Sequence, residues 1–238
     1  AIEHFDGEAA FTSDKNNMIN NITATSGGAI YLTDIEATDV NRIFDSRYSY
    51  NKGAMVLHML RFKLGDANFF QGVKNYLNDP ALAYNYAKTP DLQAHLESVS
   101  GINLTEFFSD WVYNQGYPSY TIVATNYASG QVQIAINQTQ SHPSVSFFEM
   151  PVPIRFIGSL GEQKEVILDN TFNGQTFLVD IPFVLSSIVF DSKKDIISRS
   201  NSATLGSESF DLKTEISLFP NPTSNHLTLQ LPRGITVL

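Results

Sequence analysis

The first half of the chain carries apolar residues at helical spacing. Over residues 50–64 they recur three and four positions apart, which predicts an amphipathic helix that ends at Gly65. Asp66 is then placed to cap a second helix, whose apolar side includes Phe69 and several later aromatic and leucine side chains. Pro80 is expected to end this second helix, because proline cannot continue the hydrogen-bonding pattern.

Two further helices complete this part of the sequence. Thr89 is expected to cap one of them, because Pro90 fits the first helical position and Gly101 is a typical terminator. The other covers about residues 103–114, with its aromatic side chains turned inward. Short helices joined by tight loops predict an all-α layer over residues 1–116.

The hydrophobic period changes after residue 116. Residues 120–124 and 131–136 alternate between apolar and polar side chains, as half-buried strands do. Further strand candidates, separated by Gly, Asn and Pro, are 153–157, 165–168, 175–181 and 187–190. This pattern predicts a small antiparallel β-sandwich over residues 117–200, and the expected fold class is therefore α+β with more than one domain.

The remaining sequence predicts a linker and a short β tail. Residues 201–213 are rich in Ser and poor in large apolar groups, which is typical of linkers. Residues 214–238 follow the order strand, Pro-Asn-Pro turn, strand. The residues 1–4 resemble the tail of a helix and residues 236–238 a strand cut short, so we expect a fragment of a longer protein that carries no signal peptide of its own.

Composition excludes several classes of function. The net charge of −9 and pI near 4.9 disfavour binding to nucleic acid or to anionic membranes. No apolar run reaches the roughly 18 residues that a membrane-spanning helix needs. The absence of cysteine rules out disulfides, thiolate metal sites and cysteine nucleophiles.

The common catalytic motifs are missing from this sequence. It contains no H-E-x-x-H, no G-x-S-x-G, no P-loop and no dinucleotide fingerprint. The histidines are His4, His58, His95, His142 and His226, and no two of them lie four residues apart. A protein zinc site needs clustered donors, so we expect each histidine to lie on the surface or in the packed core.

One tyrosine is a candidate for chemistry. Tyr50 lies at the start of a predicted helix and is followed by Lys52-Gly53 and an apolar stripe. A hydroxyl at a helix start can donate to an oxygen that gains negative charge during a reaction. The same pattern also fits a tyrosine packed at the helix start with its hydroxyl on a backbone carbonyl.

Several blocks of sequence resemble the aminopeptidase N family of gluzincin zinc metallopeptidases. The first block is Tyr50-Asn51-Lys52-Gly53-Ala54, preceded by Phe44-Asp45 and followed by the apolar helix. The further blocks, in the family's order and spacing, are 64–70, 76–77, 89–92, 101–108 and 111–118. The resemblance extends over about half of the chain, and residues 117–200 occupy the position of the β-sandwich that follows the catalytic domain in some family members.

The resemblance implies a division of roles. In that family two His of H-E-x-x-H and a later Glu hold zinc, and the middle Glu acts as general base on the zinc-bound water. The tyrosine of the Tyr-x-Lys-Gly block donates a hydrogen bond to the oxyanion, and this role falls on Tyr50; Tyr48 is expected to be structural. Glu3 and Glu8 have no zinc-ligand context, so we expect the zinc ligands to precede Ala1 and the chain alone to bind no zinc and cleave no peptide.

The end of the sequence resembles a second module. The segments 218–224 and 227–229 are similar to the start of the C-terminal sorting domain of the Bacteroidetes type IX secretion system. This resemblance implies export across the outer membrane by that machinery, and a secreted or cell-surface location. An ordinary Pro-Asn-Pro turn between two strands explains the same residues.

Two functions follow from these observations. The first is a fragment of a secreted zinc aminopeptidase that removes N-terminal residues from peptides. The second is a non-catalytic homologue whose β-sandwich binds a partner or a polysaccharide at a surface. The aromatic residues it requires are Tyr84, Tyr86, Tyr113 and Tyr117, although packing in a helical core explains most of them as well.

Overall fold

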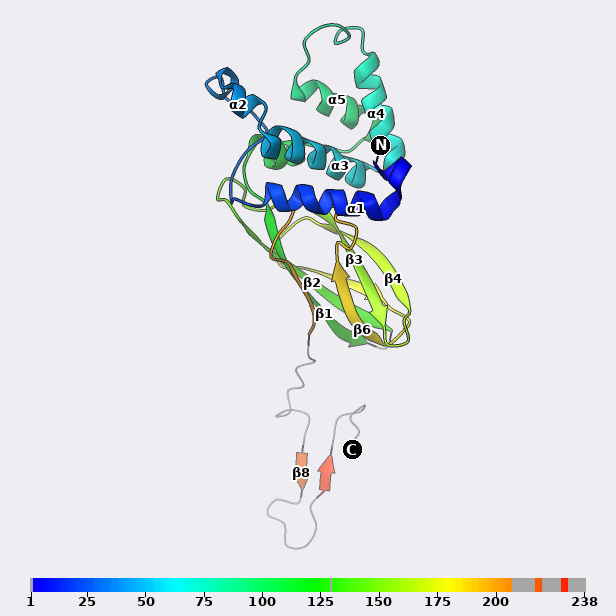
Figure 1. Ribbon diagram of the computed structural model, residues 1–238. Coiled ribbons are helices and arrows are strands. Elements are labelled where there is room, and N and C mark those ends of the chain that lie inside the picture. The colour runs from blue at the N-terminus through cyan, green and yellow to red at the C-terminus, as the bar shows by residue number, and fades with distance from the viewer. Residues whose placement is uncertain (1, 129, 207–216, 220–227, 231–238) are drawn as a thin grey trace. The chain divides into compact units, whose positions relative to one another are not determined.

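The computed structural model describes residues 2–128, 130–206, 217–219 and 228–230, which divide into two units. The larger unit comprises residues 1–205 and the smaller one residues 206–238. In the larger unit, a layer of helices is followed by two β-sheets (Figure 1). The α+β fold class predicted from the sequence is therefore confirmed.

The helices occupy the first half of the larger unit. They are α1 (Ile2–Ile22), η1 (Glu36–Thr38), α2 (Val40–Ile43), η2 (Ser46–Lys52), α3 (Gly53–Leu64), α4 (Asp66–Asn78), α5 (Thr89–Ser100), α6 (Thr105–Phe108) and η3 (Ser109–Tyr113). Both η2 and η3 are π-helical turns. None of the helices in the described ranges has the length and apolar character needed to cross a bilayer.

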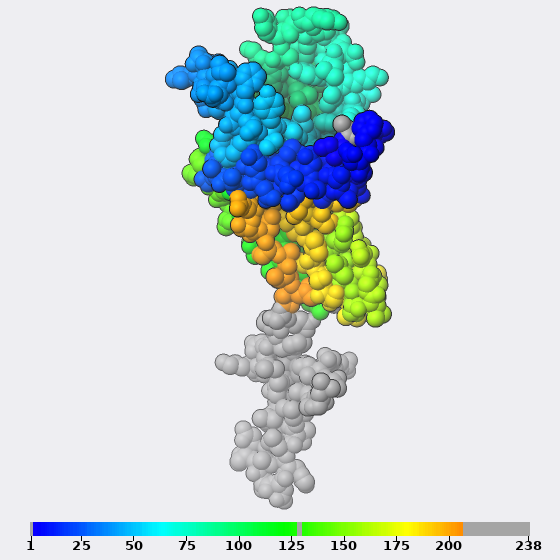
Figure 2. All heavy atoms as spheres, in the orientation of Figure 1, coloured from blue at the N-terminus to red at the C-terminus, as the bar shows by residue number. Residues whose placement is uncertain are grey.

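The first helix was not predicted from the sequence. Only residues 1–4 were assigned to a helix there, as its tail; α1 includes residues 2–4 and continues to Ile22, with non-helical backbone at Gly7, whose φ is 86°. This helix is mostly polar, and the side chains that it buries include Lys15 and Ile19. It lies as a band between the other helices and the sheets (Figures 1 and 2). Its buried face holds only Lys15, Ile19 and Ile22, so too few apolar residues mark that face for the helical period to stand out in the sequence.

The helix caps differ from the prediction. Asp66 is the first residue of α4 and caps nothing, because its carboxylate accepts a hydrogen bond from Arg61 Nε at 2.7 Å. The residue before α4 is Gly65, which adopts a φ of 76°. On the predicted apolar side of α4, Phe69 is buried but Leu77 is exposed.

The start of α5 differs in the same way. Thr89 is the first residue of the helix rather than its cap. The backbone N–H of Lys88 donates to the Asp91 carboxylate at 2.7 Å. A carboxylate in the first turn therefore satisfies a free N–H here, instead of a threonine hydroxyl.

The second half of the larger unit is a two-sheet sandwich. Its strands are β1 (Pro118–Ala128), β2 (Gln131–Gln140), β3 (Met150–Gly158), β4 (Gln163–Asn170), β5 (Gln175–Asp180), β6 (Leu185–Phe190) and β7 (Ser202–Leu205). The strand orders are β5-β2-β1-β7 and β4-β3-β6. All pairs are antiparallel except β1 with β7. Alternate residues of the strands, such as Ile122, Ile134 and Ile154, are fully buried.

Part of the predicted linker belongs to the sandwich. Residues 202–205, expected within the linker 201–213, form β7 and pair in parallel with β1, from Thr121 opposite Ser202 onward. Ala203 packs against the hydrophobic core. A polar segment with one small apolar side chain is sufficient for an edge strand, because only one of its faces contacts the core.

The smaller unit contains one described pair of strands. Strands β8 (Ser217–Phe219) and β9 (Thr228–Gln230) are antiparallel, with Leu218 opposite Leu229. The predicted Pro-Asn-Pro turn, at residues 220–222, lies outside the described residues. The same holds for most of the predicted sorting segment 214–238.

The helical layer and the sandwich share one hydrophobic core. The indole of Trp111 in η3 is fully buried, and its ring centroid lies 4.5 Å from that of Phe148, just before β3. The buried residues form a single cluster that extends from α1 to the strands. Residues 1–116 therefore contribute to the same packed unit as the sandwich.

A buried ionic network also joins the two layers. Asp195, in the loop after β6, accepts hydrogen bonds at one carboxylate oxygen from Lys15 Nζ at 2.6 Å and from His58 Nε2 at 2.8 Å. The side chains of Lys15 and Asp195 are 4% and 10% exposed. The pair therefore depends on its own geometry for stabilisation rather than on water.

Replacing Asp195 tests this network. Asp195→Ala leaves the buried ammonium of Lys15 without its carboxylate, and we expect a loss of about 3–5 kcal/mol in the free energy of unfolding, measured by urea titration. The control is Glu165→Ala, whose partner Arg155 lies 3.8 Å away at the surface, and a change below about 1 kcal/mol is expected there. Similar losses of unfolding free energy in both variants would show that the buried network contributes no more to stability than the surface ion pair.

Candidate functional site

Tyr50 lies in the π-helical turn η2, immediately before α3. Asp45 begins the turn, because its carboxylate accepts the backbone N–H groups of Arg47 and Tyr48, both at 2.8 Å. The Tyr50 side chain is 56% exposed. Within the described ranges no group hydrogen-bonds to its hydroxyl, so the arrangement observed is not the one with the phenol on a backbone carbonyl. Its catalytic role stays a prediction.

The neighbouring tyrosine is held from three sides. The ring of Tyr48 lies so close to Gly28 that a Cβ atom at Gly28 would be 1.6 Å from the ring carbon Cε1. The guanidinium carbons of Arg42 and Arg47 lie 5.1 Å and 4.5 Å from the centroid of the same ring, and Arg47 also donates to the Tyr48 hydroxyl. Gly28 has a φ of +113°, so both its conformation and this contact require glycine.

Residues 22–29, here called the carbonyl loop, lie against Tyr48. Almost all of their backbone carbonyls accept hydrogen bonds from side chains. The acceptors of this loop on the helical side are filled by three cations: Arg47, Lys52 and Arg42. Arg47 donates to Ile22 O at 2.8 Å, Thr25 O at 2.8 Å and Gly27 O at 3.0 Å; Lys52 Nζ donates to Gly28 O at 2.9 Å, and Arg42 Nη2 to Ala29 O at 2.7 Å. The segment that carries Tyr50 is thus fixed to the loop by side chains rather than by secondary structure.

The sandwich holds the same loop from its other side. The donors are Tyr117 Oη to Thr23 O at 3.1 Å, Arg199 Nη1 to Thr23 O at 2.7 Å and Ser141 Oγ to Ser26 O at 2.8 Å. In addition, the N–H of Gly28 donates to Gln115 Oε1 at 3.0 Å. The carbonyl loop therefore connects the turn that carries Tyr50 with the β-sandwich.

Lys52 is an unusual member of this arrangement, and sequence reasoning missed it. Its side chain is 1% exposed, and no carboxylate lies within ion-pair distance of it among the described residues. Burial, together with the positive charges of Arg47 and Arg42, lowers the pKa of Lys52 to about 8. The signal available in the sequence was a lysine placed directly before an apolar helix start.

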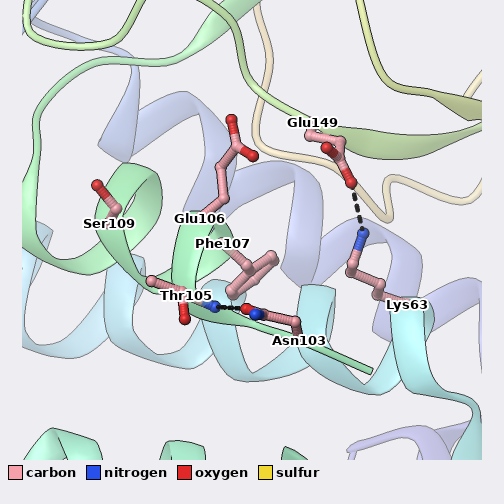
Figure 3. Close-up of a pocket in the computed structure, with 7 residues that line it drawn as sticks. All are labelled: Lys63, Asn103, Thr105, Glu106, Phe107, Ser109 and Glu149. Atoms are coloured by element: carbon pink, nitrogen blue, oxygen red, sulfur yellow. Dashed lines mark hydrogen bonds and ion pairs between the residues drawn. The ribbon is translucent and has the colours of Figure 1, made fainter. Parts of the chain in front are cut away.

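A separate hollow of about 530 Å³ lies between the helical layer and the start of β3 (Figure 3). Lys63 enters it from the end of α3 and pairs with Glu149 at 3.6 Å. Asp110, which follows the lining residue Ser109 in the sequence, is buried, and its pKa is raised to about 7 by burial and by the carboxylates of Glu106 and Glu149. Tyr50 does not line this hollow, so the two features are distinct.

Three of the four histidines among the described residues make polar contacts, and the fourth, His4, is exposed. His58 binds Asp195, His95 Nε2 lies 3.1 Å from Asp79, and His142 Nδ1 lies 2.9 Å from Ser144 Oγ. His226 lies outside the described residues. Across the described ranges, no group of three or more His, Asp or Glu side chains is arranged to hold a metal ion.

The aromatic residues considered for a binding surface behave differently from one another. Tyr84 and Tyr86 are fully exposed in the connection between α4 and α5, so core packing does not explain them. Tyr113 is 38% exposed and pairs with the ring of Tyr31 at 5.3 Å. Tyr117 is half-buried and holds the carbonyl loop.

Comparison with known proteins shows which domain the helical layer resembles. Residues 3–111 match the model of the peptidase family M1 domain. The helical part of this chain is similar to that domain. The matched residues include Tyr50, Lys52 and most of the cations that hold the carbonyl loop.

Curated relatives agree with this match. The chain is 32% identical to Aminopeptidase M1 of Arabidopsis thaliana over 135 residues, 31% identical to Aminopeptidase M1-A of Oryza sativa subsp. japonica over 175 residues, and 34% identical to Aminopeptidase N of Lactococcus lactis subsp. lactis over 96 residues. These alignments cover 56%, 73% and 40% of this chain, but 15%, 18% and 11% of the relatives. The chain thus spans less than a fifth of the length of these M1 aminopeptidases.

A solved structure shares the fold. The crystal structure of Legionella pneumophila aminopeptidase A in complex with aspartic acid superposes with a TM-score of 0.60 and 16% identity. The similarity covers 87% of this chain and 22% of that one. The helical layer and the β-sheets therefore occur together in part of a larger protein of known structure.

The stability of the M1-like layer is expected to depend on pH through Lys52. Its pKa of about 8 in the folded protein lies below the ordinary lysine pKa of 10.5, so between these values the unfolded chain holds a proton that the folded chain has lost. Rising pH therefore stabilises the fold, by about 1.4 kcal/mol per pH unit within that window.

The measurement compares wild type with Lys52→Met by urea unfolding at pH 7, 8, 9 and 10. The difference in unfolding free energy should be constant below pH 7 and move in favour of the wild type above pH 8. Lys74→Met, on the exposed face of α4, is the matched control. If the difference in unfolding free energy between wild type and Lys52→Met did not depend on pH, burial would not lower the pKa of Lys52.

Proposed function

We propose that this chain is part of a secreted zinc-dependent M1 aminopeptidase that removes N-terminal residues from peptides. In this proposal the chain supplies Tyr50, and zinc is held by residues that this chain does not contain. The match of residues 3–111 to the M1 domain supports the family. The observation that carries the role of Tyr50 is its exposed side chain, whose hydroxyl has no hydrogen-bond partner among the described residues, on a turn that is held to the carbonyl loop by other side chains.

The chemistry assigned to Tyr50 is donation of one hydrogen bond. A phenolic O–H near the carbonyl carbon under attack donates to the oxygen as it becomes negative. Such a donor contributes about 3 kcal/mol to transition-state stabilisation when it is held in place beforehand. Zinc in the parent supplies Lewis-acid activation of the carbonyl and of water, and this chain on its own is proposed to be inactive.

Substitution of Tyr50 in the full-length parent tests this function. Tyr50→Phe removes only the donor, so kcat on an aminoacyl anilide should fall about 10²–10³-fold, with zinc content unchanged. The melting temperature should also stay the same, since the hydroxyl makes no hydrogen bond in the described structure. Tyr86→Phe, at another exposed tyrosine, should keep full activity. Full activity of the Tyr50→Phe variant would show that the Tyr50 hydroxyl does not stabilise the oxyanion.

We further propose that residues 214–238 begin a sorting domain for export by the type IX secretion machinery. The sequence of 218–224 and the antiparallel pair β8 and β9 support a small β module at this position. The larger unit ends at residue 205. Of the predicted linker 201–213, residues 206–213 therefore lie outside the larger unit.

Deletion tests the export proposal in the parent organism. Removing residues 214 to the end of the natural protein should stop its appearance in the culture medium or on the cell surface. The larger unit should still fold, because the buried core lies within residues 1–205. Immunoblots of cell and medium fractions provide the measurement. Unchanged export after the deletion would leave β8 and β9 as an ordinary hairpin.

A non-catalytic surface protein is the second candidate. The full exposure of Tyr84 and Tyr86 favours it, since aromatic residues are enriched in surfaces that bind other proteins. The two candidates differ in the zinc ligands encoded with the M1 domain. An intact H-E-x-x-H with a later Glu favours the peptidase, whereas substituted ligands favour the binding protein.

A further inference from the structure

The turn that carries Tyr50 has an open side and a fixed side. Residues two apart on a helix do not project in the same direction. Tyr50 is exposed, whereas Tyr48 and Lys52, two residues before and after it, both lie against Gly28 of the carbonyl loop. The contacts that hold the turn are therefore separate from the surface available to a substrate.

Lys52 is poorly explained by stability alone. A buried ammonium without a carboxylate loses its hydration, and this costs several kcal/mol. The positive charges of Arg42 and Arg47 nearby increase this cost. A methionine fills nearly the same space without a charge, so what distinguishes the lysine is the hydrogen bond that its Nζ donates to Gly28 O at 2.9 Å.

This bond connects two rigid parts. Lys52 is the last residue of η2, and Gly28 is held in turn by Gln115, while its neighbouring carbonyls bind Arg47 and Arg42. Shortening or loss of the Lys52 contact changes the distance between the turn and the loop. A displacement of about 1 Å at a catalytic group is sufficient to reduce a rate about 10²-fold.

We propose that Lys52 is a positioning residue for Tyr50: its bond to the Gly28 carbonyl sets the place of the turn and hence of the phenolic hydroxyl. Lys52 is buried and touches no substrate, so its effect passes through Tyr50 alone. This inference rests on the proposed peptidase function. It goes further in naming the group that holds the oxyanion donor.

A double-mutant cycle in the full-length parent tests the inference. Lys52→Met should lower kcat on an aminoacyl anilide about 10–100-fold, with KM within about twofold of wild type. In the Tyr50→Phe background the same substitution should lower kcat by less than about threefold, because the group that it positions is already absent. Equal losses in both backgrounds, or no loss in either, would overturn the proposal.

Two further variants separate positioning from general damage. Lys52→Arg retains a cationic donor toward Gly28 O and should recover most of the lost kcat. Lys74→Met removes an exposed lysine from α4 and should change neither kcat nor KM. Failure of Lys52→Arg to recover activity, with zinc content and melting temperature preserved, would count against a role for the hydrogen bond.

A measurement without catalysis keeps this inference distinct from the proposed function. In the 238-residue chain with ¹³C-labelled tyrosine, Lys52→Met should shift the ring signals of Tyr50 and increase amide exchange over residues 46–52, whereas Lys74→Met should not. If Tyr50→Phe leaves the parent fully active, the peptidase role of Tyr50 fails while this shift still confirms the contact. Unchanged signals in Lys52→Met would refute the positioning role directly.

Discussion

The carbonyl loop, residues 22–29, is the constraint on which the rest of the larger unit depends. Backbone carbonyls that lie outside helices and sheets need donors when they are buried. Here the donors are long side chains, from the turn around Tyr50 on one side and from the sandwich on the other. Arg47 and Lys52 are thus satisfied mainly by peptide dipoles rather than by carboxylates, whereas Arg42 also pairs with Glu36 at 3.4 Å.

The π-helical geometry of η2 follows from the same constraint. The N–H of Tyr50 bonds to the oxygen of Asp45, five residues earlier, so the turn is wider than an α-helical one. This width lets Tyr48 and Lys52 both reach the loop while Tyr50 remains exposed. Wide turns of this kind are frequent at functional sites, because they direct one side chain away from the regular helical pattern.

The periodicity of the sequence predicted the elements better than their connections. The helical layer, the sandwich and the ends of helices at Gly65 and Pro80 follow from local preferences. Helix α1 and strand β7 were missed, because their burial depends on neighbours distant in the sequence. The place of Tyr50 at a helix start made it a candidate, and only the family resemblance assigned it a role, which stays a prediction. The contact of Lys52 could not be predicted, since its partner Gly28 lies 24 residues away.

The β-sandwich also contributes to the position of Tyr50, through its contacts with the carbonyl loop. An oxyanion donor is effective only if its position is fixed before charge develops. Side chains of the α-layer alone fix η2 to the carbonyl loop, but the loop itself is held by Tyr117, Ser141 and Arg199 of the sandwich half. The buried network of Lys15, His58 and Asp195 joins the same two halves at a second point. The carbonyl loop and the ionic network thus join the two layers at two separate places, which restricts rotation of one layer against the other. In this way the sandwich helps to hold the turn that carries Tyr50.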